Sequence, residues 1–343
     1  MKRSLSLAAF LILSLGVMSV MIRAESKEPL KGKSMIEKVE YRGWKNNVKI
    51  SNGTVELIVT CDVGPRIISY SYPNGFNVMK NYDDMMGKSG EAEWQIRGGH
   101  RFWIAPEDLT RTYFADNNPV KYEEVSPGVV RFTPPPEKEY HVQKEMEVAL
   151  SPTGSRVTIK LKVTNIGREA TELAPWGPTV MAPGGVEIIP LPSKKNHPGH
   201  PKNAKSPADY GPNQNLILWP YFDFKDTRWT FGSQYLFLRQ DKTKGPTKIG
   251  LAHRMGWVGY VNHGTMFVKH VPYVEGATYP DTGTNYQTFS NEDMLEMETC
   301  GVLVKLEAGK SAELVESWEL FKDVPDVKSE EDVEKSILPL LKK

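Results

Sequence analysis

Short segments in which apolar and polar side chains alternate recur along most of the chain. The alternation is strictest at residues 157–164, which are therefore expected to form a β-strand with one buried and one solvated face. Turn sequences such as Thr153-Gly154 separate the segments. Strands are predicted at 48–50, 54–60, 66–72, 129–133, 141–150, 156–165, 216–219, 235–239, 248–252, 256–261, 265–270, 295–306 and 312–321. This pattern predicts an all-β protein, an antiparallel β-sandwich rather than a parallel α/β sheet.

Helical periodicity is confined to the C-terminal end, where Ser329 is suited to cap a short helix through Leu341. Residues 194–213 are rich in Lys, Pro, Asn and Gly, and they predict a long exposed loop. The strands predicted before and after that loop are of the same short, turn-separated kind, so we expect a single domain. The predicted organisation is a signal peptide at 1–24, an extension at 25–39, a β-sandwich domain at 40–322 and a helical tail at 323–343.

The first residues have the features of a secretory signal peptide. Lys2 and Arg3 form a basic start, residues 5–22 carry no charge, and Ala24 is a small residue suited to cleavage. The apolar run is also long enough for an uncleaved membrane anchor, which remains the alternative. No second run of that length follows. We therefore expect a secreted or periplasmic protein without stable membrane insertion once the signal is removed.

Charge and cysteine content narrow the possible chemistry. Lys and Arg total 43 against 42 Asp and Glu, and this balance argues against a nucleic-acid partner. Cys61 and Cys300 both lie in apolar, strand-like segments, so a disulfide and two buried thiols are both open. The sequence contains no P-loop, dinucleotide fingerprint, nucleophile elbow or zinc signature, so it predicts no cofactor and no metal site. A cation bound by carboxylates is the open alternative.

Residues 96–108 concentrate the side-chain types of a binding site. They include Arg97, Gly98, Gly99, His100, Arg101, Trp103 and Glu107. Aromatic rings stack on the C–H surface of a sugar, and guanidinium and carboxylate groups form hydrogen bonds with its hydroxyls. The alternative is a polar loop that caps a sheet. The density of site-type residues favours a site for a carbohydrate ligand.

A carboxylate pair follows late in the chain. Glu296 and Glu298 are two residues apart, so on a regular strand both point to the same face. Opening a cyclic hemiacetal needs a base and an acid, and we expect Glu298 or Glu296 as the base with His100 as the acid. The alternative is a solvated strand face. Lys269 and Trp176 are further binding candidates, although an exposed lysine and a core tryptophan are equally open.

The order of these motifs resembles the galactose mutarotase-like fold. Residues 64–70 are similar to that family's early glycine-containing strand, and Arg97-Gly98-Gly99 resembles the loop of its hexose-phosphate epimerase branch. Residues 295–300 look like the catalytic-glutamate strand of aldose 1-epimerases, and residues 318–321 like the usual last strand. The chain resembles most closely a group of exported bacterial proteins with a domain of unknown function. The resemblance implies a β-supersandwich that binds carbohydrate in a cleft on one sheet.

One departure concerns the general acid of aldose 1-epimerases, which is a mid-chain histidine. The corresponding segment appears at residues 173–180 and contains no histidine. Three classes of function therefore stay open for an exported protein with this fold. The first is a carbohydrate enzyme, with aldose 1-epimerase-like chemistry or a polysaccharide lyase or hydrolase activity. The second is non-catalytic glycan binding in the cell envelope, and the third is a structural β module of a larger envelope assembly. The carboxylate pair and the loop rich in arginine and histidine favour the first two.

The signal-peptide interpretation predicts that the mature protein begins near Glu25. N-terminal sequencing of the protein recovered from the native host measures this directly. Recovery of an intact Met1 in the cytosolic fraction would argue against export.

Overall fold

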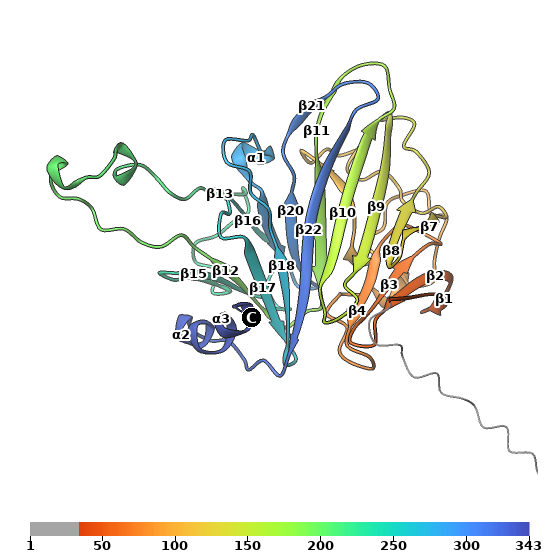
Figure 1. The fold of residues 1–343 in the computed structure, drawn as a ribbon, viewed down its shortest axis with the longest axis horizontal. Coiled ribbons are helices and arrows are strands. Elements are labelled where there is room, and N and C mark those ends of the chain that lie inside the picture. Colours follow the sequence, from red (N-terminus) through yellow and green to blue (C-terminus); the bar gives the residue numbers. More distant parts are fainter. Residues whose placement is uncertain (1–33, 343) are drawn as a thin grey trace, which may run out of the picture. The chain divides into compact units, whose positions relative to one another are not determined.

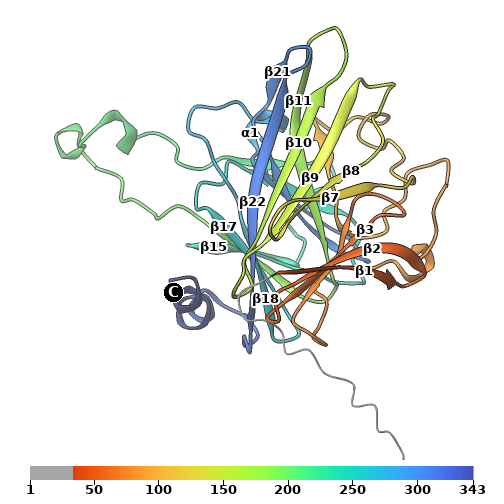
Figure 2. The same ribbon diagram turned by 45° about the vertical axis from the view of Figure 1, so that its right-hand side comes forward.

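The computed structural model of the chain describes residues 34–342. The signal peptide and most of the predicted extension lie outside the described residues. Two antiparallel sheets pack against each other, as Figures 1 and 2 show. No helix of the described part is long and apolar enough to cross a membrane. The expected all-β sandwich is confirmed.

The first sheet has 12 strands. Its main path runs β1 (Met35–Tyr41), β2 (Trp44–Ser51), β3 (Glu56–Thr60), β4 (Ile67–Ser71), β5 (Gly99–His100), β11 (Thr171–Met181), β20 (Leu295–Cys300), β19 (Tyr286–Ser290), β16 (Thr247–Leu251) and β13 (Leu216–Leu218). Two short strands, β6 (Trp103–Ala105) and β21 (Val304–Leu306), pair with further parts of β11. The long strand β11 is therefore central to this sheet.

The second sheet has 10 strands. Its order is β14 (Trp229–Phe231), β15 (Tyr235–Arg239), β12 (Val186–Pro190), β17 (Trp257–Asn262), β18 (Thr265–His270), β22 (Ser311–Lys322), β10 (Val157–Asn165), β9 (Val142–Leu150), β8 (Val129–Thr133) and β7 (Lys121–Ser126). The strict alternation at β10 is matched by its burial, which alternates between buried and half-buried along the whole strand.

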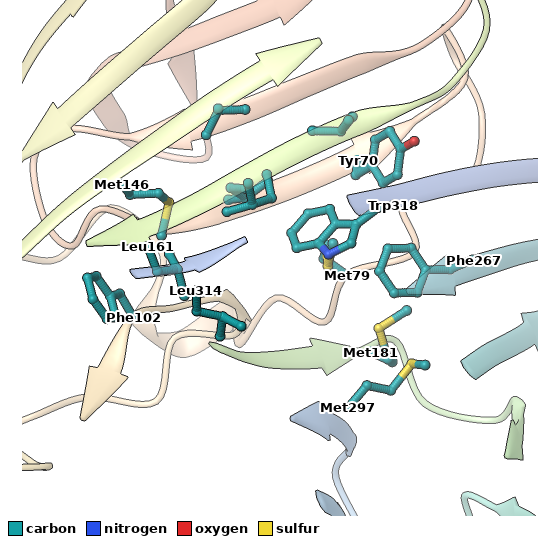
Figure 3. Packing of buried hydrophobic residues seen from close by; sticks show 14 of the residues in the cluster. Tyr70, Met79, Phe102, Met146, Leu161, Met181, Phe267, Met297, Leu314 and Trp318 are labelled. Carbon is teal, nitrogen blue, oxygen red and sulfur yellow. The ribbon is translucent and has the colours of Figure 1, made fainter. Parts of the chain in front are cut away.

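The core fills the space between the two sheets, which we call the interlayer. Side chains of both sheets contribute to one continuous apolar cluster. Figure 3 shows Met146, Leu161 and Leu314 together at one end of this cluster. Further along, the ring centroids of Phe267 and Trp318 are 5.4 Å apart. Apolar side chains of both sheets therefore pack directly against each other in the interlayer.

The C-terminal helical segment forms as expected. It consists of α2 (Glu330–Asp332), a π-turn at η4 (Val333–Ile337) and α3 (Leu338–Leu341), and Ser329 caps it in a capping box with Asp332. Val333 and Ile337 pack with Ile188 and Val268 on the face of the second sheet that turns away from the interlayer. The segment is therefore part of the domain core. The other short helical turns are η1 (Asp83–Met85), η2 (Pro201–Asn203), η3 (Pro207–Asp209) and α1 (Pro280–Gly283).

Strand β11 was not expected from the sequence, because Pro175 and Pro178 lie within it. A proline lacks the N–H that a central strand normally donates. Here both prolines still accept hydrogen bonds through their carbonyls, from the N–H groups of Gly301 at 2.8 Å and Arg101 at 3.0 Å. Gly301 also divides the predicted strand 295–306 into β20 and β21. The first sheet begins at Met35, within the predicted extension.

The segment between β12 and β13 extends away from both sheets in Figures 1 and 2. Most of its side chains at 194–213 are exposed, in agreement with the predicted loop. The cysteines are buried and unpaired: Cys61 belongs to the interlayer cluster, whereas Cys300 belongs to a separate aromatic cluster. Of the two open alternatives, the structure has two buried thiols.

We expect Leu161→Ala to lower the free energy of unfolding by about 2–5 kcal/mol, because it leaves a cavity in the interlayer. Equilibrium denaturation in urea measures the change. Thr158→Ala, on the solvated face of the same strand, is the control and should change stability by less than about 0.5 kcal/mol. Equal effects of the two substitutions would contradict the assignment of the two faces.

Candidate functional site

A cavity of about 240 Å³ lies on the face of the first sheet that turns away from the second sheet. We call this face the cleft face. In β20, Leu295 and Met297 point into the interlayer core, so the alternate residues Glu296 and Glu298 point to the cleft face. Both carboxylates line the cavity together with Trp176 of β11.

A tight turn before β5 brings the arginine-rich loop to the same cavity. Arg97, Gly98 and Gly99 have positive φ angles of 47°, 93° and 69°. A Cβ on Gly98 would lie 2.0 Å from the carbonyl oxygen of Lys80, so no other residue fits there. The backbone of this turn therefore lies close to that of Lys80. After this turn, Arg101 reaches the cleft face.

Arg101 and Glu296 form the first ion pair of the cavity. Arg101 Nη1 donates to Glu296 Oε1 at 2.6 Å, and both side chains are less than a tenth exposed. The guanidinium also lies 3.8 Å from the ring centroid of Trp103 and 5.5 Å from that of Trp94. The two rings and the carboxylate hold the guanidinium in one orientation.

Lys248 and Glu298 form the second ion pair. Lys248 Nζ on β16 donates to Glu298 Oε2 at 3.1 Å, and both side chains are almost fully buried. The ammonium also lies 5.1 Å from the ring of Trp176 and 4.9 Å from the ring of Trp219. Glu298 Oε1 is buried without a hydrogen-bond partner among the described residues. The carboxylate therefore keeps one unsatisfied acceptor oxygen among the described residues.

The electrostatics of Glu298 suit proton transfer near neutral pH. Burial raises the pKa of its carboxyl to about 7, although Lys248 lowers it, and repulsion from Glu296 adds to the rise. Burial alone would lower the pKa of Lys248, but the attraction of Glu298, Glu107 and Glu296 outweighs it and raises that pKa. Glu298 is therefore the member of the pair whose pKa lies near neutrality.

Aromatic rings form the remaining wall. The ring centroids of Trp94 and Trp103 are 5.1 Å apart, Trp103 and Trp176 are 5.2 Å apart, and Tyr113 lies 5.1 Å from Trp103. Glu107 is exposed at the rim and accepts a hydrogen bond from the hydroxyl of Tyr113. Flat apolar faces beside buried charges are typical of sugar sites.

The structure places His100 and Lys269 in the interlayer, so neither lies beside the glutamates in the cavity, as the roles predicted for them require. His100 Nδ1 lies 2.9 Å from the Thr179 hydroxyl, and burial holds the pKa of the ring well below its usual value, with Lys269 and Arg101 as further causes. The physical reason is alternation, because His100 immediately precedes Arg101 and points to the opposite side of the sheet. His100 is therefore not placed to donate a proton in the cavity.

Lys269 lies on β18 of the second sheet, and its side chain extends across the interlayer to the first sheet. Its ammonium donates to the carbonyls of Gly177 at 2.7 Å and Met297 at 2.9 Å, and it lies 3.4 Å from a carboxylate oxygen of Glu316. These carbonyls belong to β11 and β20, the strands that carry Trp176 and Glu298. Lys269 therefore holds the cavity strands together instead of contacting a ligand.

Arg97 also lies away from the cavity. It is fully buried, and its guanidinium binds Glu91, the Asn117 side chain at 2.8 Å and the Met85 carbonyl at 3.2 Å. These contacts fasten the loop before the glycine turn. Of the residues predicted for the site, the cavity brings together Arg101, Trp103, Glu107, Trp176, Glu296 and Glu298.

Sequence reasoning missed several residues that line the cavity. They are Lys248, Trp94, Tyr113, Tyr221, Phe289 and Met294. Lys248 begins a predicted strand, and its alternation with Ile249 is the only signal for its direction. No three His, Cys, Asp or Glu side chains within residues 34–342 are grouped so that they could hold a metal ion.

No protein-family model matches the chain, and no curated protein matches it. Solved structures do share its fold. A galactose mutarotase-like protein from Lactobacillus casei superposes with a TM-score of 0.52 at 11% identity, over 80% of this chain and 100% of that chain. A putative mutarotase from Salmonella typhimurium gives a TM-score of 0.51 at 11% identity, over 81% and 90% of the two chains.

A TPR-domain containing protein from Parabacteroides distasonis is also similar, with a TM-score of 0.55 and 16% identity. The match covers 81% of this chain and 47% of that protein, so the chain spans about half of its length. The protein thus has the galactose mutarotase-like fold, which confirms the fold that the sequence motifs implied.

The raised pKa of Glu298 predicts a specific pH dependence of stability. Its usual value is 4.5 and its value in the folded protein is about 7, so the protonated carboxyl favours the folded state. As pH rises from about 4.5 to about 7, the free energy of unfolding of the wild type should fall relative to that of Glu298→Gln. Urea denaturation across this range measures the difference.

The control is Glu307→Gln, because Glu307 is exposed. Its stability should follow that of the wild type at every pH. Parallel curves for the wild type and Glu298→Gln would show that Glu298 does not titrate in this range.

Proposed function

We propose that the protein binds a sugar ring in the cavity on the cleft face and interconverts its anomers, with Glu298 as the general base. The observation that carries this proposal is the unpartnered, buried Oε1 of Glu298, on a carboxyl whose pKa is about 7, beside aromatic walls. The galactose mutarotase-like fold supports it, since putative mutarotases share this fold.

The reaction needs one proton removed and one supplied. Glu298 takes the proton of the anomeric hydroxyl, the bond between the anomeric carbon and the ring oxygen breaks, and the ring oxygen receives a proton from the ammonium of Lys248. The anomeric hydroxyl oxygen and the ring oxygen are attached to the same carbon. Lys248 Nζ and Glu298 Oε2 are 3.1 Å apart, so the acid and the base can reach these two oxygens at the same time. The open-chain aldehyde rotates, and the reverse transfers close the ring. Lys248 thus takes the role that the absent mid-chain histidine has in aldose 1-epimerases.

The other residues orient the ring. Trp103 and Trp176 offer flat faces for its C–H surface, and the Arg101–Glu296 pair offers both donors and acceptors for its hydroxyls. Glu107 at the rim adds an acceptor for a substituent that faces solvent. The cavity of about 240 Å³ suits one or two sugar rings rather than a long chain.

We further propose that the protein acts outside the cytosol. Support comes from the basic start and the uncharged run at residues 5–22 of the sequence. A site for free sugars or chain ends in the envelope is consistent with export.

Glu298→Gln should reduce anomer interconversion by a factor on the order of 10² to 10⁴, because the amide keeps the shape of the side chain and cannot accept the proton. A thermal-shift screen of mono- and oligosaccharides, uronic acids included, identifies the binding sugar first. NMR exchange spectroscopy on that sugar measures turnover, and calorimetry measures affinity, which should change little.

Glu307→Gln serves again as the control and should leave both quantities unchanged. Unchanged turnover in Glu298→Gln would eliminate Glu298 as the base. Tight binding by a wild type without turnover would support the second candidate, a non-catalytic glycan-binding protein. That candidate is favoured by the two closed ion pairs, which already satisfy Glu296 and one oxygen of Glu298. Chain cleavage in the screen would instead indicate a lyase or hydrolase.

A further inference from the structure

The balance of charge in the cavity on the cleft face bears on the kind of sugar that it takes. Five charged side chains line it, and they are Arg101, Lys248, Glu107, Glu296 and Glu298. Arg101 is paired with Glu296 at 2.6 Å, and Lys248 is paired with Glu298 at 3.1 Å. Both cations of the cavity therefore already bind carboxylates, and one carboxylate is left over.

Glu107 is the carboxylate outside these two pairs. It has no ion-pair partner within residues 34–342, and the hydroxyl of Tyr113 donates a hydrogen bond to its Oε1. This hydrogen bond orients the carboxylate, while the side chain remains exposed at the rim. Since both oxygens of a carboxylate accept hydrogen bonds, Oε2 is open to a donor that enters from solvent.

The charge of Glu107 acts inside the cavity. Burial lowers the pKa of Lys248, whereas the carboxylates of Glu298, Glu107 and Glu296, in this order, raise it. Glu107 thus attracts this ammonium more strongly than Glu296 does, although Glu296 is buried in the cavity wall. Because the attraction between charges falls with distance, the carboxylate of Glu107 lies on the cavity side of the rim.

We propose that the sugar bound in this cavity is an amino sugar, whose ammonium group pairs with the carboxylate of Glu107. This inference rests on the proposed function, because it takes the same cavity as a sugar site. Tyr221 also lines the cavity and is exposed, so its ring offers a face to the same cation. Glu298 and Lys248 remain free to act on the anomeric centre, so recognition and proton transfer use different carboxylates.

The same balance disfavours anionic sugars. The carboxylate of a uronic acid would meet three carboxylates of the cavity, while both cations are engaged. To bind Arg101 or Lys248 it would have to displace Glu296 or Glu298 and leave a buried charge unpaired, which costs free energy. A neutral sugar avoids this repulsion but leaves Glu107 without a cation. The expected order of affinity is therefore amino sugar, neutral sugar, uronic acid.

The test compares sugars that differ in one charged group. Calorimetry near pH 6, where an amine is protonated and a uronic acid is ionised, gives the affinities of glucose, glucosamine, 6-amino-6-deoxyglucose and glucuronate. The better of the two amino sugars should bind more tightly than glucose by a factor of about 3 to 10, as expected for a charge pair at an exposed rim. Glucuronate should bind more weakly than glucose. The galactose series, measured in parallel, covers the other orientation of the 4-hydroxyl.

Glu107→Gln removes the charge and keeps the shape of the side chain. The ratio of amino-sugar affinity to neutral-sugar affinity should fall to about 1, since the amide oxygen carries no charge to attract the ammonium. Contacts that both sugars share cancel in this ratio. Glu292→Gln is the control, because Glu292 is an exposed carboxylate that does not line the cavity, and it should keep the wild-type ratio. Circular dichroism checks that each variant is folded.

Three results would overturn the inference. Equal affinity of the wild type for amino and neutral sugars, or tightest binding of the uronic acid, would do so and leave sugar binding itself standing. A preference that persists in Glu107→Gln would remove Glu107 as its cause. Failure of every amino sugar to bind would also overturn it, and the broader thermal-shift screen then decides separately whether the proposed function survives. The first comparison uses the wild type, so it stands even if the variant does not fold.

Discussion

The pairing of β11 with β20 is the constraint on which the site depends. In this register Gly177 faces Thr299 and Pro178 faces Glu298. Because side chains alternate across a strand, this one register sends Glu296 and Glu298 to the cleft face and Met297 into the core. A shift of one residue would exchange the carboxylates with the core residues. The ammonium of Lys269, which binds carbonyls of both strands from the interlayer, stabilises the observed pairing.

The four buried charged side chains that line the cavity form two ion pairs. Arg101 and Glu296, like Lys248 and Glu298, are almost fully buried, and each charge has a partner within hydrogen-bond distance. The loss of hydration is large for such groups, so removal of one partner would leave an uncompensated charge. For Glu298 the effect of burial outweighs the attraction of Lys248, since its pKa is raised in spite of the adjacent ammonium. Burial of the Glu298 carboxyl therefore has two effects. It costs free energy of folding, and it brings the pKa of this carboxyl close to neutrality.

The segment around Phe102 connects two cavities. Arg101 and Trp103 line the cavity on the cleft face, whereas Phe102 between them lines a second cavity of about 160 Å³. Tyr113 and Phe114 repeat this arrangement in the following loop. Each cavity is therefore built by residues whose immediate neighbours serve the other.

The sequence alone determined the features that depend on local periodicity and on backbone conformation. Strict alternation predicted the strand at 157–164, and the spacing of Glu296 and Glu298 predicted their common face. The density of site-type residues at 96–108 correctly indicated that Arg101, Trp103 and Glu107 line a cavity. Tertiary structure alone decided which lysine reaches the cavity. Lys248 and Lys269 both lie on strands, and sequence does not say that their strands belong to different sheets. The tertiary structure also placed His100 in the interlayer and Arg101 on the cleft face. A shift of one residue in strand register exchanges the two faces, and the register is set by pairing between strands that are distant in the sequence.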